Sequence, residues 1–208
     1  MALIRKTQVP PSGDSRRLPR DCEGLLRQLD DESAEVRRWA ALDLAAFPDA
    51  AEAVCARLEQ ETQPPVREAM FTTLIEIGGN VVVKGLIPLL RSEDAALRNS
   101  VVEALQQLPD AVSPDMATML EDPDPDYRIF AVNVLANLRH PQAPVWLQQV
   151  VERDADFNVC ASAVEVLAEV GAPEAIPALT ALPGRFDDEP FMQFCVQAAI
   201  RRIQGNGG

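Results

Sequence analysis

The amino-acid sequence predicts an all-α protein, an α-solenoid of about six helical hairpins in a curved superhelical array. Three observations support this prediction: a row of apolar positions that recurs six times, a helix-breaking residue after each copy, and an aliphatic composition. Of the 208 residues, 47% are hydrophobic but only 5% are aromatic. Leu, Val, Ile and Ala therefore have to fill the interior, which suits closely packed helices.

The recurring unit is a row of four apolar positions, namely a first residue and those four, eight and eleven places later. The first residues of consecutive copies lie 30, 31, 30, 32 and 33 residues apart, at Val36, Val66, Leu97, Tyr127, Val159 and Met192. Such offsets place the four side chains on one face of an α-helix. Each copy is therefore expected to contain one amphipathic helix, named the B helix.

Each predicted B helix ends at a helix-breaking residue and follows a shorter apolar segment. The breaking residues are Pro48, Gly78, Pro109, His140-Pro141, Gly171 and Gly205. Glycine can adopt the left-handed conformation at a helix end, and proline cannot continue a helix. The apolar segments, such as 25–29, 86–90 and 175–179, predict an A helix that runs antiparallel to its B helix. Because no hairpin can bury its apolar face alone, the hairpins are expected to stack.

The repeat spacing divides the chain into an N-terminal arm and a repeat domain. We predict a flexible basic arm over residues 1–20 and a domain over residues 21–205. Its repeats are expected at about 21–48, 49–79, 80–110, 111–141, 142–172 and 173–205. Acidic residues between the A and B helices, as in residues 122–125, are expected to cap the amide groups that begin each B helix.

Charge argues against nucleic acid as a partner, and the lack of long apolar runs argues against a membrane span. The first 20 residues carry five basic side chains and one acidic one, so a net charge of −13 leaves −17 on the remainder. A body this acidic repels phosphate backbones, and we expect no nucleic-acid binding. The chain contains no run of about 18 uncharged apolar residues and no apolar stretch typical of a secretory signal. We therefore expect no membrane span and a cytoplasmic location.

No constellation of residues in the sequence indicates catalysis, a cofactor or a metal. The four cysteines lie far apart without a CxxC pair, and His140 is the single histidine. This pattern gives neither zinc-ligand spacing nor a disulfide framework, and no phosphate-binding glycine motif or HExxH is present. We expect a protein that is not an enzyme, with reduced cysteines at its helix interfaces.

The units resemble HEAT-like repeats of the phycobilisome-lyase type over about residues 22–205. Residues 31–40 (DESAEVRRWA) and 173–179 (PEAIPAL) carry the resemblance. It implies that the B helices line a concave face and that the protein is a scaffold or adaptor for another protein, in bacterial signalling. The alternative is a phycobilin lyase-like subunit or a tetrapyrrole–protein chaperone. Trp39, Trp146 and Tyr127 fall in different repeats, so the sequence marks no tetrapyrrole pocket.

The resemblance also implies a ladder between repeats, in which an acidic residue pairs with an arginine six places later. The pairs here would be Asp31 with Arg37, Glu61 with Arg67, and Asp122 with Arg128. Arg98 instead has Ser92 in that place, with Glu93 beside it. The last two repeats keep the acidic residue but have Cys160 and Gln193 in place of the arginine.

Helix geometry predicts which B-helix side chains are free to contact a partner. The second and sixth places after each start point away from the apolar row. In the middle repeats they form a polar strip with one apolar member, namely Glu68, Thr72, Asn99, Glu103, Ile129, Asn133 and Glu165. Amides and carboxylates around an apolar anchor suit a protein partner, here a basic one, although an ordinary solvated face is the alternative. Phe194 is expected to cover the last repeat or to join two copies of the chain.

Overall fold

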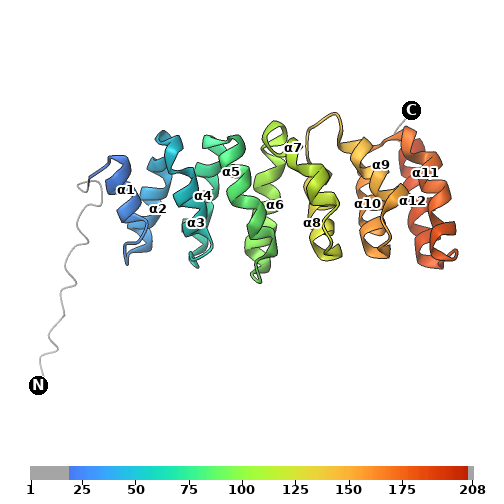
Figure 1. Ribbon diagram of the computed structural model, residues 1–208, viewed down its shortest axis with the longest axis horizontal. Helices are drawn as coiled ribbons and strands as arrows, with labels where there is room; N and C mark the ends of the chain where they lie inside the picture. The colour runs from blue at the N-terminus through green and yellow to red at the C-terminus, as the bar shows by residue number, and fades with distance from the viewer. Residues whose placement is uncertain (1–18, 206–208) are drawn as a thin grey trace, which may run out of the picture. The chain divides into compact units, whose positions relative to one another are not determined.

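The computed structural model describes residues 19–205, and all of their regular secondary structure is helical (Figure 1). Residues 1–18 of the predicted basic arm lie outside the described residues. The chain divides after Ile77 into two compact units, which we name the first unit (residues 19–77) and the second unit (residues 78–205). The predicted fold class, an all-α solenoid of helical hairpins, is confirmed.

The first unit contains two hairpins. Helices α1 (Cys22–Gln28) and α2 (Ala34–Asp43) form one, and α3 (Ala51–Leu58) and α4 (Pro64–Ile77) form the other, with short 3-10 turns η2 (Leu44–Ala46) and η3 (Pro48–Ala50) between them. The B helices α2 and α4 pack on each other. Their contact includes a buried hydrogen bond of 2.6 Å, which the Thr73 hydroxyl donates to the backbone carbonyl of Ala41.

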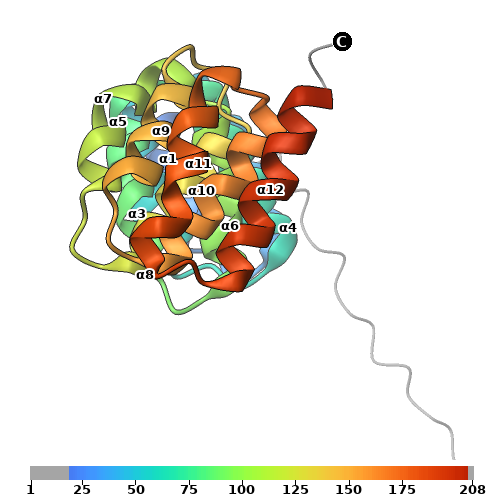
Figure 2. The same cartoon turned by 90° about the vertical axis from the view of Figure 1, so that its right-hand side faces the viewer.

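The second unit contains four hairpins in two layers. One layer holds the A helices α5 (Gly79–Leu86), α7 (Pro109–Leu120), α9 (Ala143–Arg153) and α11 (Ile176–Ala181). The other holds the B helices α6 (Ala95–Gln106), α8 (Pro125–Ala136), α10 (Phe157–Val170) and α12 (Pro190–Gly205). Consecutive B helices pack against each other. Figure 2 shows α5, α7 and α9 on one side of this unit and α6 and α12 on the other.

Acidic side chains begin three of these B helices, as the loop composition predicts. Asp94 accepts hydrogen bonds from the amides of Ala96 and Leu97 at the start of α6. Asp124 and Asp156 hold the equivalent positions before α8 and α10. Each carboxylate satisfies amides that have no partner within the helix and lies at its positive dipole end. The caps fix where each B helix begins, and therefore which side chains it buries.

The recurring apolar row forms the core of each hairpin. All four positions are buried in two repeats of the second unit, those that begin at Leu97 and Tyr127. Val170 departs from this pattern and is 38% exposed. It is the last residue of α10, and Gly171 ends that helix with a positive φ of 70°. The last side chain of the apolar row is therefore not buried in this repeat, because the helix ends there.

Candidate functional site

A two-pronged ion pair links the two hairpins of the first unit. Arg37 on α2 donates from Nε to Glu61 Oε2 over 2.7 Å and from Nη2 to Glu61 Oε1 over 3.0 Å. Its third nitrogen, Nη1, donates to the backbone carbonyl of Asp31 over 2.8 Å. Glu61 is 1% exposed and Arg37 8% exposed. The guanidinium therefore bridges its own loop and the loop of the next hairpin.

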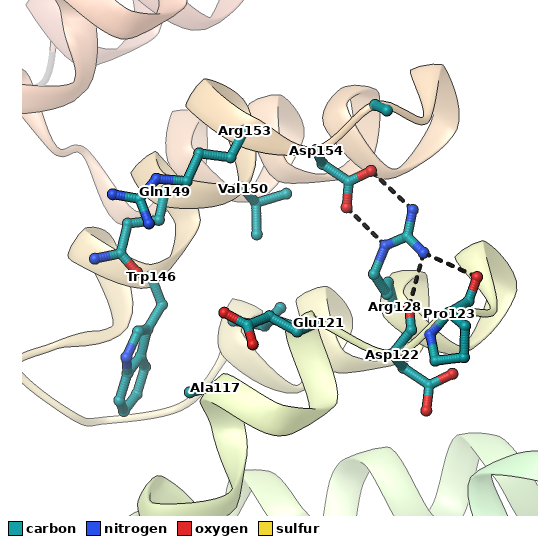
Figure 3. A pocket seen from close by; sticks show the side chains of 12 residues that line it. Ala117, Glu121, Asp122, Pro123, Arg128, Trp146, Gln149, Val150, Arg153 and Asp154 are labelled. Carbon is teal, nitrogen blue, oxygen red and sulfur yellow. Dashed lines mark hydrogen bonds and ion pairs between the residues drawn. The ribbon is translucent and has the colours of Figure 1, made fainter.

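The same arrangement recurs in the second unit around Arg128 (Figure 3). Its Nε and Nη2 donate to the two carboxylate oxygens of Asp154 over 2.7 and 2.8 Å. Its Nη1 donates to the carbonyl of Asp122 over 2.8 Å. The pair borders a cavity of about 390 Å³ between α7 and α9, which Trp146 also lines. Trp146 stacks on the His140 ring, with 5.1 Å between the centroids.

These contacts correct the pairing implied by the family resemblance. The arginine bonds the backbone carbonyl six places earlier, not the side chain there; this holds for Arg37, Arg67, Arg98 and Arg128. The carboxylate at that place turns back to cap its own loop, as when Asp122 Oδ1 accepts from the amide of Asp124. In the two complete cases the carboxylate on the guanidinium comes from the next hairpin.

Burial and hydrogen bonding oppose each other at Glu61. Burial alone raises the pKa of this carboxyl group. The hydrogen bonds from Arg37 and the Gln63 amide, with the positive charges of Arg37 and Arg57, outweigh that effect and hold its pKa below the ordinary value. The pair is therefore ionised at neutral pH, and its role is structural.

Arg98 on α6 departs from the pattern of Arg37 and Arg128. Its Nη1 donates to the Ser92 carbonyl over 2.6 Å, but its buried Nε has no hydrogen-bond partner. The acidic residue at the equivalent place of the next hairpin, Asp122, accepts instead from Arg91 Nη2 over 2.5 Å. Arg91 also stacks on Tyr127, with its guanidinium carbon 4.1 Å from the ring centroid. Arg98 thus lies in the ladder position without a carboxylate.

In the repeat after that of Arg128, Cys160 replaces the arginine, and a guanidinium from a later segment contacts the loop instead. Cys160 Sγ donates weakly to the Asp154 carbonyl over 3.4 Å. Arg185, in the 3-10 segment η6 (Leu182–Phe186), donates to the carbonyls of Val151 and Asp154. A guanidinium therefore still covers this loop, although it comes from outside the B helix. Sequence reasoning missed Arg185 because the residue lies outside the repeating register.

The structure places the residues of the predicted polar strip in both units. In the first unit Glu68 and Thr72 lie exposed on α4, and the Thr72 hydroxyl donates to the Glu68 carbonyl over 2.9 Å. In the second unit the exposed members lie on the neighbouring helices α6, α8 and α10, namely Asn99, Glu103, Asn133 and Glu165. The second unit therefore presents four polar members of the strip on three packed B helices.

Ile129, the predicted apolar anchor, is not the freely exposed side chain that helix geometry predicts. It is half-buried, and it lines a cavity between α6 and α8 together with Phe130 and Arg98. The expected exposure was derived from α8 alone, and the contact of Ile129 with a partner stays a prediction. Residues of the segment before α6 and Arg98 in the first turn of α6 line the same cavity as Ile129.

The most exposed large apolar side chains on the B helices lie at α12 instead. Phe191 is 56% exposed and Phe194 is 64% exposed. Both line a groove of about 530 Å³ between α10 and α12. Its other walls are mostly small residues, and Glu165 and Arg202 supply its charged groups. Two phenylalanines so close in sequence at the start of the last B helix were a signal that could have directed attention to this groove.

A comparison with protein families identifies the repeat. The family model for HEAT repeats matches residues 22–106 and 113–190, which is most of the chain. The chain belongs to the HEAT-repeat family. A search of curated protein sequences finds no significant match.

Several solved structures resemble this HEAT-repeat chain. An archaeal HEAT-like repeats protein from Thermococcus onnurineus NA1 is 14% identical and has a TM-score of 0.47, with 87% of this chain and 86% of that chain covered. A designed armadillo repeat protein is 17% identical (TM-score 0.39; 86% and 98% covered). The complex of CpcE and CpcF of phycocyanin lyase from Nostoc sp. PCC7120 is 19% identical (TM-score 0.38; 95% and 99% covered). At these identities the likeness concerns the fold alone.

Two further findings concern residues 19–205. Within this part of the chain, no helix is long and apolar enough to cross a membrane. Nor does any group of three or more His, Cys, Asp or Glu side chains among these residues have the arrangement to hold a metal ion. None of the four cysteines, which all lie in this part of the chain, forms a disulfide, and Cys55 and Cys160 are buried.

Proposed function

We propose that this HEAT-repeat protein is a non-enzymatic scaffold that binds a partner protein along the B helices of its second unit. The observation that supports this most is the groove between α10 and α12, with Phe191 and Phe194 exposed beside it. Large apolar side chains exposed next to a hollow are costly to leave in water and mark interaction sites. Aromatic residues are also enriched among the anchors of protein interfaces.

The groove fits the apolar face of a partner helix. Its walls include Ala161, Ala168 and Ala198, whose short side chains leave room for a larger residue of the partner. Glu165 lines the same groove and is exposed, so a lysine or arginine of the partner can meet it there. We therefore propose an amphipathic, basic helix as the bound segment.

The polar strip on α6, α8 and α10 continues this surface with hydrogen-bonding side chains. Asn133 is exposed on α8, which packs against α10, and Asn99 and Glu103 are exposed on α6, which packs against α8. Amides can donate and accept, and the glutamate adds a charge that attracts a basic partner. The proposed interface thus has an apolar anchor at α12 and a polar region over the three preceding B helices.

The test uses a partner isolated with the wild-type protein from a lysate of the source cells and then purified. Replacing Phe194 with Asp, or Phe191 with Asp, should weaken binding by about 30-fold or more, equivalent to about 2 kcal/mol. Val81→Asp and Val145→Asp are matched controls, because these valines are 59% and 52% exposed but lie on A helices. Unchanged affinity in both phenylalanine variants, or an equal loss in the valine variants, would move the interface elsewhere.

The proposal that the protein acts as a scaffold also predicts no tetrapyrrole binding. His140, the single histidine, is stacked on Trp146 and lies outside the proposed interface. Mixing the purified protein with phycocyanobilin should leave the visible absorption spectrum of the bilin unchanged. A shifted absorption band that titrates with protein would favour the lyase-like alternative over the scaffold.

A further inference from the structure

Four arginines of the described chain hold the same ladder position, namely Arg37, Arg67, Arg98 and Arg128, and one of them, Arg98, has a buried Nε without a hydrogen-bond partner. Arg37 and Arg128 each present Nε and Nη2 to both oxygens of a carboxylate from the next hairpin. Arg98 makes the same contact from Nη1 to the carbonyl six places earlier, yet its buried Nε has no partner. The two complete cases show what the geometry of this position accepts, which is one side-chain carboxylate held by two parallel hydrogen bonds.

The cause of the gap at Arg98 is a second arginine in the same loop. Arg91 precedes Arg98 by seven residues, and its Nη2 binds the carboxylate of Asp122. Its Nη1 also lies 3.5 Å from Asp124 Oδ2. Seven places before Arg37 and Arg128 the chain has Asp30 and Glu121, which cannot divert a carboxylate in this way. The internal ligand of Arg98 is therefore held by Arg91.

A cavity of about 540 Å³ adjoins the incomplete position. Arg98 and Arg91 line it with Tyr127, Ile129 and Phe130. The ring of Phe130 lies 5.3 Å from the guanidinium carbon of Arg98. The cavity therefore combines a guanidinium that lacks a carboxylate with aromatic and aliphatic walls. Such walls lower the local dielectric constant and strengthen a charge-assisted hydrogen bond made inside.

We propose that this cavity binds a side-chain carboxylate, a glutamate or aspartate of the partner protein, on Arg98. This inference rests on the proposed function and adds a second contact to the same surface. Ile129 lines the cavity at the same register position that Asn99 and Phe194 hold on α6 and α12. A partner segment that crosses the B helices can therefore insert a side chain here while its main chain continues past the cavity. Because the partner chain is expected to continue past the cavity, a side-chain carboxylate is favoured over a C-terminal carboxylate.

The acidic residues around the cavity restrict which segments fit. Glu93, Asp124 and Asp126 also line it, and all three are exposed. They attract cations, so lysine or arginine residues of the partner beside the inserted carboxylate add to the affinity of the carboxylate itself. Because Arg98 Nε is buried, a carboxylate that binds it must displace a neighbouring side chain. The half-buried ring of Phe130, which lies against the Arg98 guanidinium, is the side chain that we expect to be displaced.

The test is a titration of the full-length protein, in which NMR follows the Nε–Hε resonances of its arginines. The probes are N-acetylglutamate α-amide, its neutral isostere N-acetylglutamine amide, and N-acetylalanine, which carries only a terminal carboxylate. We expect the glutamate probe to shift the Arg98 resonance saturably and to bind about tenfold or more tightly than the glutamine probe. The resonances of Arg37 and Arg128, whose carboxylates are in place, should not move.

Variants separate binding at Arg98 from general charge effects. Arg98→Gln should abolish the saturable shifts of the amides of residues 127–130, whereas Arg153→Gln, which removes an exposed arginine elsewhere, should preserve them. If Arg98→Gln does not fold, the wild-type titration decides the question alone. Equal binding of the glutamate and glutamine probes, or shifts that follow ionic strength only, would overturn the proposal. Binding of N-acetylalanine alone would overturn the assignment to a side chain.

The two proposals fail independently. The probe titration uses the free protein and does not depend on the groove at α12. If Phe194→Asp leaves partner affinity unchanged while the glutamate probe still binds at Arg98, the proposed interface is wrong and the carboxylate site stands. If the glutamate probe does not bind but the phenylalanine variants lose the partner, the carboxylate site alone is wrong.

Discussion

Arg37 and Glu61 lie 24 residues apart in the chain and form a two-pronged ion pair that is almost completely buried, with Nε–Oε2 and Nη2–Oε1 distances of 2.7 and 3.0 Å. Desolvating two charges costs free energy, which the pair recovers only if every hydrogen bond is made. Glu61 Oε1 also accepts hydrogen bonds from the backbone amides of Thr62 and Gln63. The pair therefore aligns two loops of the first unit, and its two members depend on each other.

Removing one partner of this pair should be strongly destabilising. Glu61→Ala leaves the Arg37 guanidinium buried without its carboxylate, which we expect to lower the free energy of unfolding by about 3–5 kcal/mol. Glu59→Ala is the matched control, because Glu59 is an exposed glutamate two residues away, and it should change stability by less than about 0.5 kcal/mol. Urea denaturation followed by circular dichroism measures both. Similar midpoints for the two variants would contradict the structural role.

The lowered pKa of Glu61 makes part of the stability depend on pH. A carboxyl group whose folded-state pKa lies below its unfolded value of about 4.3 stabilises the protein above that pH. The contribution is lost as the pH falls through the folded-state pKa. Glu61→Gln removes this group, so the difference in unfolding free energy between wild type and variant should shrink steadily below about pH 4.3. A difference that stays constant from pH 7 to pH 3 would contradict the assignment.

The sequence predicts the helices well because their causes are local. Apolar spacing, breaking residues and loop acids each act within a few residues, and Asp94, Asp124 and Asp156 cap the helices that follow them. The ladder was predicted less well because its carboxylates reach across about 25 residues. Spacing alone does not reveal that Asp31 turns to the Ser33 amide while Arg37 crosses to the next loop.

The candidate site was predictable only in part, because exposure depends on neighbouring elements. Asn99 and Asn133 are exposed as their helical positions require. Ile129 has an equivalent position, yet residues of α6 and its preceding loop border it. Arg91 matters for the same reason, since its effect on Asp122 depends on how close two loops lie in space. The spacing of residues along the sequence does not show which loops and helices lie close together in space.

The burial of Ile129 can be tested directly. Ile129→Ser should lower the free energy of unfolding by about 1–3 kcal/mol, because it removes apolar contacts from the wall of the α6–α8 cavity. Asn133→Ser places the same residue at an exposed position of the same helix, and its effect should stay within about 0.5 kcal/mol. If thermal or urea denaturation finds no difference between them, Ile129 faces solvent after all.

The cysteines should react with alkylating agents in two groups. Burial raises the pKa of Cys55 and of Cys160 to about 11, with nearby Glu52 adding to the effect at Cys55. At pH 8 only about one in a thousand of these thiols is then ionised. Cys22 and Cys195 are only half-buried. Mass spectrometry after iodoacetamide treatment should find Cys22 and Cys195 modified first, and Cys55 and Cys160 only after urea is added. Early modification of Cys160 would contradict its burial.

The competition between Arg91 and Arg98 for Asp122 predicts the behaviour of the proposed carboxylate site. Arg91→Gln frees Asp122, which can then bind Arg98 as Glu61 binds Arg37. The filled site should no longer bind N-acetylglutamate α-amide, and the Arg98 Nε–Hε resonance should move toward that of Arg128. Stability should change little, because Arg91 is half exposed and its ion pair contributes at most about 1 kcal/mol.

A second substitution makes this prediction decisive. Asp122→Asn in the Arg91→Gln background removes the internal carboxylate, so the probe should bind Arg98 again with an affinity close to that of wild type. Arg153→Gln is the matched control. Arg153 lies seven places before Cys160, and that ladder position has no arginine whose carboxylate could be diverted. It should leave probe binding unchanged. If the Arg91→Gln variant binds the probe as wild type does, Asp122 is not the internal ligand of Arg98, and the gap there has another cause.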